Sequence, residues 1–491
     1  MSFSPNALRR RGSFLLALVF GLTAAADALF YQQPLGINAA LFASAVLAAL
    51  IARGGRFLRS WPGRYVAAAT LGMLVALAVH PGVLPIAMCL LGLATLAIID
   101  RSGWTYSVTR WAVRWVRFGG AAATQGVRDA VLQRRWLRTH GSAFAGGRRW
   151  AAWGVPVLLS GVFVALFAVA NPVVQRAVRS AWDFGVQRVM HLGEWVAPGR
   201  VVLWAVVGVA AWGVLRARVG RWQPRQRRAA LSAASLDRVA PTGRVIRCLI
   251  LFNAVFAGQT LLDLYYLVGG AALPDGLTYA AYAQRGAYPL VATALLAGAF
   301  VLLAFRPGGV AQKSPLARRL VALWIGQNVL LMASAAWRLN LYVQAYSLTR
   351  WRFAAALWMA LVAVGFVWLV WRIASNRDNT WLLQRVALTA AVLFYALCFV
   401  NPDGAIARFN VAHCVEAGGE GRPLDVAYLE SLGPEALPAL RAFAAEHPER
   451  NDAHQSVARL VQRLDGQLTN WRGWTWRRAT LASGAGPAGP G

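Results

Sequence analysis

Long apolar stretches separated by short polar segments dominate the first 400 residues of the chain. A bilayer core about 30 Å thick needs about 20 mostly apolar residues for each helix that crosses it. The pattern therefore predicts an all-α, polytopic transmembrane bundle of about eleven spans. We expect these spans at 14–30, 36–52, 65–79, 83–99, 151–170, 201–215, 248–268, 288–305, 320–336, 353–371 and 386–400.

Composition supports the membrane class and excludes several others. Of the 491 residues, 58% are hydrophobic and 14% are charged, whereas soluble globular domains carry roughly 25% charged residues. Lysine and arginine number 50 against 19 acidic residues, which gives a formal net charge of +31. These values exclude a soluble enzyme, a disordered chain and a disulfide scaffold, and they fit a membrane protein with basic loops.

The positions of the basic residues predict the orientation. Short cytoplasmic loops carry an excess of arginine and lysine. With the amino terminus inside, the inner segments hold about four times as many of these residues as the outer ones. We therefore expect the bacterial cytoplasmic membrane, with the N-terminus inside and the C-terminus outside. Residues 1–28 also resemble a cleavable signal peptide, and its removal would leave every later loop on the same side.

The basic charge is divided among six predicted cytoplasmic segments beside helix ends. Recognition of nucleic acid needs instead a basic face on one folded domain. The charge therefore indicates topology, and we expect no nucleic-acid partner.

A cytoplasmic segment at 101–150 contains a strongly two-sided helix over residues 104–118. The aromatic face consists of Trp104, Trp111, Trp115 and Phe118, and the basic face of Arg110, Arg114 and Arg117. Such a helix suits the inner-leaflet interface, where anionic lipids attract the basic face. The alternative is that the aromatic face packs on the protein's own spans.

Two acidic residues, Asp27 and Asp263, lie inside predicted spans, where an ionised side chain costs about 2.5–3.5 kcal/mol to insert. We expect both in the outer halves of these spans. An outward polar cavity is one interpretation, and its further members would be Arg285, Gln327, Asn328 and Arg338. The other interpretation is structural, with Asp263 paired to an arginine and the amides bridging helices.

No catalytic residue, cofactor or metal is predicted for this chain. The HExxH motif of metalloproteases is absent, and the four cysteines include no CxxC pair.

The composition changes at Asn401, after which acidic and basic residues are nearly balanced. Short helices are predicted at 423–433, from Pro434 and from about Asp452. They would form a small extracytoplasmic module that is short for a core of its own. We expect a transmembrane domain at 1–400, this module at 401–481 and a disordered tail at 482–491. The tryptophans and arginines of 471–478 are typical of a membrane interface.

Four stretches of the chain resemble a known family. They are Asp27–Gly36, Leu277–Pro289, Trp337–Thr349, and Asn401–Asn410 with the following Asp425–Gly433. On these residues the chain resembles bacterial multi-pass membrane proteins catalogued as domain of unknown function 4173. The resemblance implies no reaction. Three of the stretches lie on the predicted outer face and the fourth begins there, so it implies that the outer face carries the function.

Three functions remain open at this point. The first is a non-enzymatic sensor or assembly component whose outer loops 269–287 and 337–352, with the tail, bind a ligand or a protein partner. The second is a transporter with a cavity around Asp27 and Asp263. The third is a membrane enzyme acting on a lipid-linked substrate. It ranks last because no pair of catalytic side chains stands out, and whether the chain is an enzyme at all stays open.

Overall fold

The computed structural model of the chain describes residues 5–140, 197–216, 242–267, 314–419 and 422–484, together with residues 160, 179, 180 and 298. These residues form helices, and no strand occurs among them. The all-α fold predicted from the sequence is therefore confirmed. The chain divides into two compact units, which are described separately.

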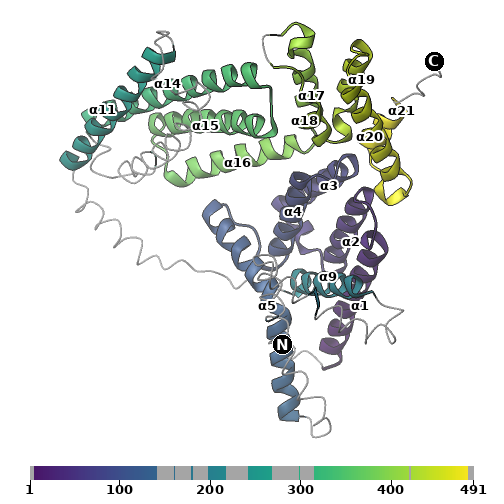
Figure 1. Cartoon of the computed structure of the whole chain (residues 1–491). Helices are drawn as coiled ribbons and strands as arrows, with labels where there is room; N and C mark the ends of the chain where they lie inside the picture. Colours follow the sequence, from purple (N-terminus) through teal and green to yellow (C-terminus); the bar gives the residue numbers. More distant parts are fainter. Residues whose placement is uncertain are drawn as a thin grey trace. The chain divides into compact units, whose positions relative to one another are not determined.

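The first unit comprises residues 1–105 and 110–221. Its described helices are α1 (Pro5–Phe30), α2 (Ile37–Arg53), α3 (Trp61–Val79), α4 (Val83–Ser102), α5 (Val108–His140) and α9 (Pro198–Arg216) (Figure 1).

The second unit comprises residues 106–109 and 222–491. Its long helices are α11 (Thr242–Leu267), α14 (Pro315–Tyr346), α15 (Arg350–Ala374) and α16 (Asn379–Leu397). They are followed by α17 (Pro402–Ala412), α18 (Val426–Ser431), α19 (Leu437–Glu446), α20 (Asn451–Leu468) and α21 (Trp476–Ser483). Single 3₁₀ turns lie between these shorter helices at Val415–Ala417, Pro434–Ala436 and Trp471–Gly473.

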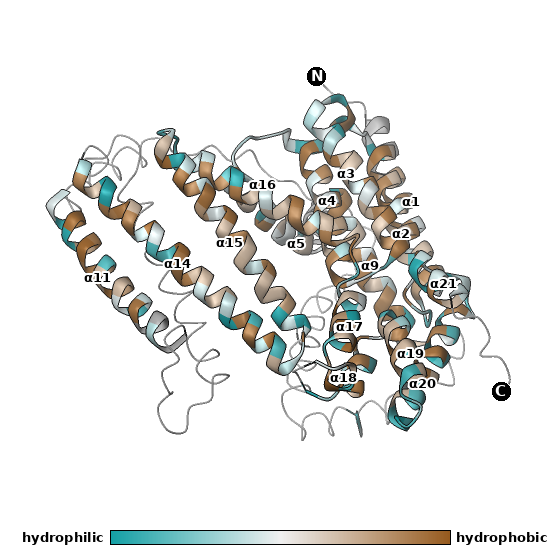
Figure 2. Ribbon diagram, turned by 90° about the horizontal axis from the view of Figure 1, so that it is seen from above, coloured by the Kyte–Doolittle hydropathy of each residue, from teal (hydrophilic) through white to brown (hydrophobic). Residues whose placement is uncertain are grey.

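Within the described ranges, eight helices are long and apolar enough to cross a membrane. They are α1, α3, α4, α9, α11, α14, α15 and α16, and Figure 2 shows hydrophobic residues along α1 and α15. Each coincides with a predicted span. The span predicted at 36–52 is the shorter apolar helix α2. Those predicted at 151–170 and 288–305 lie outside the described residues, except for Ser160 and Gly298.

One predicted outer loop is a helix. Residues 337–352 were expected to be a loop, but α14 continues to Tyr346 and leaves only 347–349 as a turn. The segment contains no glycine or proline that would end a helix. At about 1.5 Å per residue, the 32 residues of α14 are longer than the bilayer core is thick. Part of α14 therefore extends beyond the membrane core.

The turn between α1 and α2 depends on a buried asparagine. Asn38 Nδ2 donates to the carbonyl oxygens of Leu29 and Pro34, at 2.8 and 3.0 Å, and Asn38 Oδ1 accepts from the Gly36 amide at 2.8 Å. Gln32 adopts a positive φ of 52° within this turn. The tight hairpin expected from the sequence is therefore held by side-chain hydrogen bonds to its own backbone.

The helices after residue 401 bury a continuous hydrophobic core. Its largest fully buried side chains are Ile406, Leu429 and Phe443, which come from α17, α18 and α19. Leu348 and Phe353, which flank and begin α15, pack against the same cluster. The core is larger than the length of this segment led us to expect, because the α14–α15 turn contributes to it. We call residues 402–483 the C-terminal module.

Candidate functional site

Asp27 lies near the end of α1 and is bound by α9. Arg200 donates hydrogen bonds to both carboxylate oxygens, with Nε–Oδ1 and Nη2–Oδ2 distances of 2.7 Å each. The Trp204 indole donates to Oδ1 at 3.0 Å. The Arg200 guanidinium also lies 4.9 Å from the ring centre of Tyr31. This carboxylate therefore has charged and neutral donors from a helix 173 residues away in the chain.

The other end of α9 repeats this arrangement. Asp129 of α5 forms an ion pair with Arg216 at 3.2 Å and accepts a hydrogen bond from the Trp212 indole at 2.9 Å. At each end an arginine and a tryptophan four residues apart bind one carboxylate. Arg200 and Arg216 are about 24 Å apart along α9, which is close to the thickness of a bilayer core. The two ion pairs therefore hold α9 against α1 and α5 near both of its ends.

We expect Asp27 to act mainly as a structural counter-ion. Asp27→Asn and Arg200→Gln should each lower the melting temperature of the purified protein. The double variant should melt no lower than the worse single variant, because removing one partner leaves an uncompensated charge and removing both does not. Asp465→Asn, on the exposed side of α20, is the control. If the double variant instead lost as much melting temperature as the two single variants together, Asp27 and Arg200 would not stabilise the protein through each other.

One amide of the predicted polar cluster, Gln327, bridges two helices of the second unit together with Asn253, which was not among the predicted members. Gln327 Nε2 donates to the Asn253 carbonyl oxygen at 3.2 Å, and Asn253 Nδ2 donates to the Leu320 carbonyl oxygen at 3.0 Å. Asn328 Nδ2 bonds within α14, to the Trp324 carbonyl oxygen. These contacts join α11 to α14.

The structure describes the surroundings of only some of the other residues in the predicted polar cluster. Arg338 is buried in α14 and donates to Ser334 at 3.4 Å. Asp263 lies in α11, but its side chain is outside the described residues, as is the whole of Arg285. Asp27 has its partners in the first unit. A common cavity of these six residues therefore stays a prediction.

The aromatic face of α5 packs inside the first unit. Trp111 and Phe118 are buried, and the Trp115 indole donates to Thr95 of α4 at 3.0 Å. Trp104 is more exposed and lies 5.1 Å from Trp111, measured between ring centres.

The basic face of α5 is more exposed than its aromatic face. Arg110 and Arg117 are exposed, while Arg114 lies over Trp111 and donates to the Gly103 carbonyl oxygen at 2.9 Å. The arrangement accords with packing of the aromatic face on the protein's own spans. Contact of the basic face with anionic lipid stays a prediction.

The C-terminal module docks on the turn between α14 and α15. Asn410 of α17 and Leu348 exchange two hydrogen bonds: the Leu348 amide donates to Oδ1 at 2.7 Å, and Nδ2 donates to the Leu348 carbonyl oxygen at 2.9 Å. The Arg350 amide donates to the Tyr428 hydroxyl at 2.9 Å. The side chains of α17 and α18 thus satisfy backbone groups that α14 and α15 leave open at their ends.

An ion pair strengthens the same junction. Arg350 binds both carboxylate oxygens of Asp403, at 2.6 and 3.0 Å, and also donates to the Leu432 carbonyl oxygen at 3.2 Å. The Arg422 guanidinium lies 4.5 Å from the ring centre of Tyr346 at the end of α14. Bidentate arginine–carboxylate pairs fix orientation as well as distance. The C-terminal module is therefore held in a defined orientation relative to α14 and α15.

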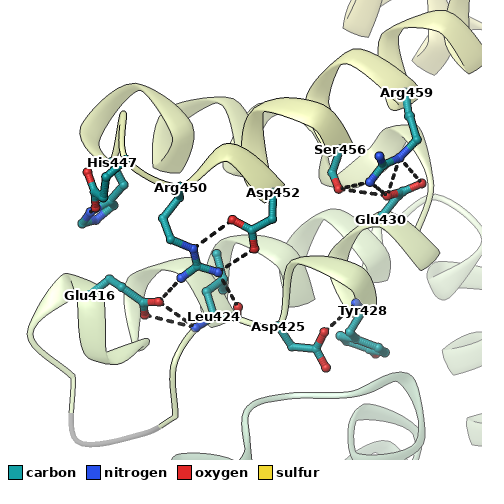
Figure 3. Close-up of polar contacts among 11 residues, drawn as sticks. Glu416, Leu424, Asp425, Tyr428, Glu430, His447, Arg450, Asp452, Ser456 and Arg459 are labelled. Carbon is teal, nitrogen blue, oxygen red and sulfur yellow. Dashed lines mark hydrogen bonds and ion pairs between the residues drawn. The ribbon is translucent and has the colours of Figure 1, made fainter.

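Within the module, the half-buried Glu416 and Glu430 and the exposed Asp452 join segments through arginines (Figure 3). Arg450 bridges Glu416 and Asp452 and also donates to the Leu424 carbonyl oxygen at 3.3 Å. This contact ties the loop before α18 to the start of α20. Hydrogen bonding to Arg450 holds the pKa of Asp452 below its ordinary value of 3.8.

A second network joins α18 to α20. Glu430 accepts from Arg459 at 2.7 Å, from Arg463 at 2.8 Å and from the Ser456 hydroxyl at 2.9 Å. The hydrogen bonds from Arg459 hold the pKa of Glu430 below its ordinary value of 4.5. The lowered pKa means that this carboxylate stabilises the folded module above its unfolded pKa, and that the stabilisation is lost as the pH falls through the folded one.

Glu430→Gln should speed hydrogen exchange of the α18 and α20 amides at pH 7 by about fivefold, as a loss of about 1 kcal/mol would. Acidification to about pH 3.5 should accelerate exchange in the wild type and have less effect in the variant, after correction for intrinsic rates. Glu446→Gln, at an exposed position of α19, is the control. Equal acid sensitivity of Glu430→Gln and the wild type would contradict the assignment.

Metal and thiol chemistry find little support in the described residues. Among them, no group of three or more histidine, cysteine or acidic side chains is placed to hold a metal ion. Cys89, Cys398 and Cys414 are buried free thiols. Burial raises the pKa of the Cys414 thiol, which lowers its reactivity.

No sequence motif singles out the residues that dock the module. Asp403 and Asn410 lie in one of the stretches that carry the family resemblance, and Leu348 lies in another. That coincidence was the one available signal. It pointed to the regions without indicating that their side chains bond to each other.

These features define an all-α protein with several helices able to cross a membrane. A family model described as a domain of unknown function, DUF4153, matches residues 14–443. The chain belongs to this family. The expected membership in the family numbered 4173 is therefore wrong, because the matching model is that of a different domain. Searches of curated proteins and of solved structures found no match to this chain.

Proposed function

We propose that this protein is a non-enzymatic sensor or assembly component of the bacterial cytoplasmic membrane. Its N-terminus lies inside and its C-terminal module outside. The module and the α14–α15 turn together form the surface that receives a ligand or a protein partner. The reciprocal hydrogen bonds between Asn410 and Leu348 carry this proposal.

Oriented docking matters for such a role. A binding event affects a distant part of a protein only if it changes the equilibrium between two states of that protein. A module joined only through a flexible linker would bind a partner without altering the spans. Here Arg350 and Leu348 couple α17 and α18 to the ends of two membrane helices. Binding at the module that favours the docked or the released state would thus bias α14 and α15.

The charge pattern of the loops supports the orientation. The outer loop expected at 269–287 lies outside the described residues, so the proposed surface consists of the α14–α15 turn and the module. The division into a transmembrane domain at 1–400 and an extracytoplasmic module at 401–481 belongs to the same proposal.

Complementation of cells that lack this protein tests the role. Asn410→Ala removes both hydrogen bonds to Leu348 and should abolish rescue, as deletion of 402–491 should, while the amount of the point variant in the membrane stays normal. Asn451→Ala changes an exposed asparagine at the start of α20 and should rescue fully.

The transporter alternative gives the opposite pattern. Rescue by the chain that lacks 402–491, together with loss of rescue by Asp27→Asn at normal membrane levels, would overturn the proposal. Rescue by Asn410→Ala would likewise show that docking of the module is not required.

A further inference from the structure

Three span ends meet the C-terminal module on one membrane face. Helices α15 and α16 form an antiparallel pair joined by a short turn, so α16 ends on the face where α15 begins. The module bonds to the start of α15 through Arg350 and to the end of α16 through Arg477, whose Nη2 donates to the Val400 carbonyl oxygen at 3.2 Å. Helix α21, which carries Arg477, is therefore at the depth where the span α16 leaves the membrane.

Exposed aromatic side chains gather at these span ends. Trp351 at the start of α15 is 86% exposed. Trp471, in the 3₁₀ turn before α21, is 54% exposed, and Trp476, the first residue of α21, is 61% exposed. Phe399 and Val400, just past the end of α16, are 41% and 47% exposed. Bulky apolar groups at this depth are typical of the belt that membrane proteins place among lipid headgroups.

The corner that carries two of these tryptophans is fixed by its own hydrogen bonds. Asn470 Oδ1 accepts from the Arg472 amide at 3.0 Å, and Thr475 Oγ1 accepts from the Arg478 amide at 3.2 Å. The Arg478 guanidinium donates to the Gly473 carbonyl oxygen at 2.6 Å. Leu481 of α21 packs against the core of the module. The two indoles are thus presented from a rigid support.

Arginine lies among these aromatic residues. The Arg472 guanidinium is 4.8 Å from the ring centre of Trp471, and Arg477 lies beside the end of α16. Guanidinium groups bind phosphate by paired hydrogen bonds, while indoles favour the boundary between acyl chains and headgroups. The combination matches the chemistry of a phospholipid surface.

We infer that Trp351, Trp471 and Trp476 insert into the headgroup region of the bilayer around α15 and α16, and that this contact anchors the C-terminal module to lipid. The occupant of this surface is the phospholipid bilayer itself. The anchor goes beyond the proposed function and does not depend on it, since it holds for either orientation of the chain.

Photocrosslinking in lipid nanodiscs tests the anchor with the full-length protein. Thr480 is exposed on α21, one turn after Trp476, and would be replaced by p-benzoylphenylalanine. Irradiation in nanodiscs of phosphatidylcholine and phosphatidylglycerol should give a peptide whose mass includes one phospholipid. The same photoreactive residue at His454, exposed near the opposite end of α20, should give none.

The tryptophans themselves are tested in the same assay. Trp471→Ala with Trp476→Ala should reduce the lipid adduct at position 480 several-fold. Both side chains are more than half exposed, so the core of the module keeps its packing.

An adduct at position 480 no more abundant than at 454, or one unaffected by the double substitution, would overturn the inference. Crosslinking of position 480 to a protein in native membranes, without a lipid adduct in nanodiscs, would also overturn it and assign the surface to a protein partner.

Discussion

The exchange of hydrogen bonds between Asn410 and Leu348 holds the C-terminal module against the turn between α14 and α15. Further contacts join the same parts: Arg350 bonds to Asp403, and the Arg350 amide donates to the Tyr428 hydroxyl. Helix α17 thus lies against the turn between α14 and α15, and the Arg350–Asp403 ion pair joins α15 to α17. The core of the module can then include Leu348 and Phe353 from the spanning helices.

Arginine–carboxylate pairs join distant segments at several places in this protein. The acidic residues are few, 19 against 50 basic ones, and the pairs of Asp27, Asp129, Asp403 and Glu430 each join two helices. A planar guanidinium with several donors can bind a carboxylate and a backbone carbonyl together, as Arg350 does. This property suits a chain whose basic residues are almost all arginine.

Sequence patterns predicted the membrane helices well because burial in lipid demands long apolar runs, and such runs are local. They also predicted a short helix at 423–433, where the structure has α18 (Val426–Ser431). Asp425 accepts from the Tyr428 amide at 2.9 Å, and Gly433 has the positive φ of 88° that favours glycine. The prediction ended α14 too early at its C-terminal end because polar residues can mark a loop, although nothing there breaks a helix.

Contacts between residues far apart in the chain could not be predicted in the same way. Asp27 was identified as unusual, but its partner Arg200 lies 173 residues away and resembles any other arginine at a helix end. Asn410 is one of several asparagines after 400, and only the fold places it against Leu348. The partners of these side chains are a property of helix packing, which hydrophobic periodicity does not specify.

Hydrogen exchange at the α14–α15 turn, with the protein in a bilayer, tests the docking of the module most directly. The amides of Leu348 and Arg350 lie at this turn, and their acceptors are side chains of α17 and α18. Docking predicts that both exchange far more slowly than their intrinsic rates and that Asn410→Ala restores fast exchange at Leu348. Exchange of both amides at intrinsic rates in the wild type would show that the module is not docked and would contradict the account.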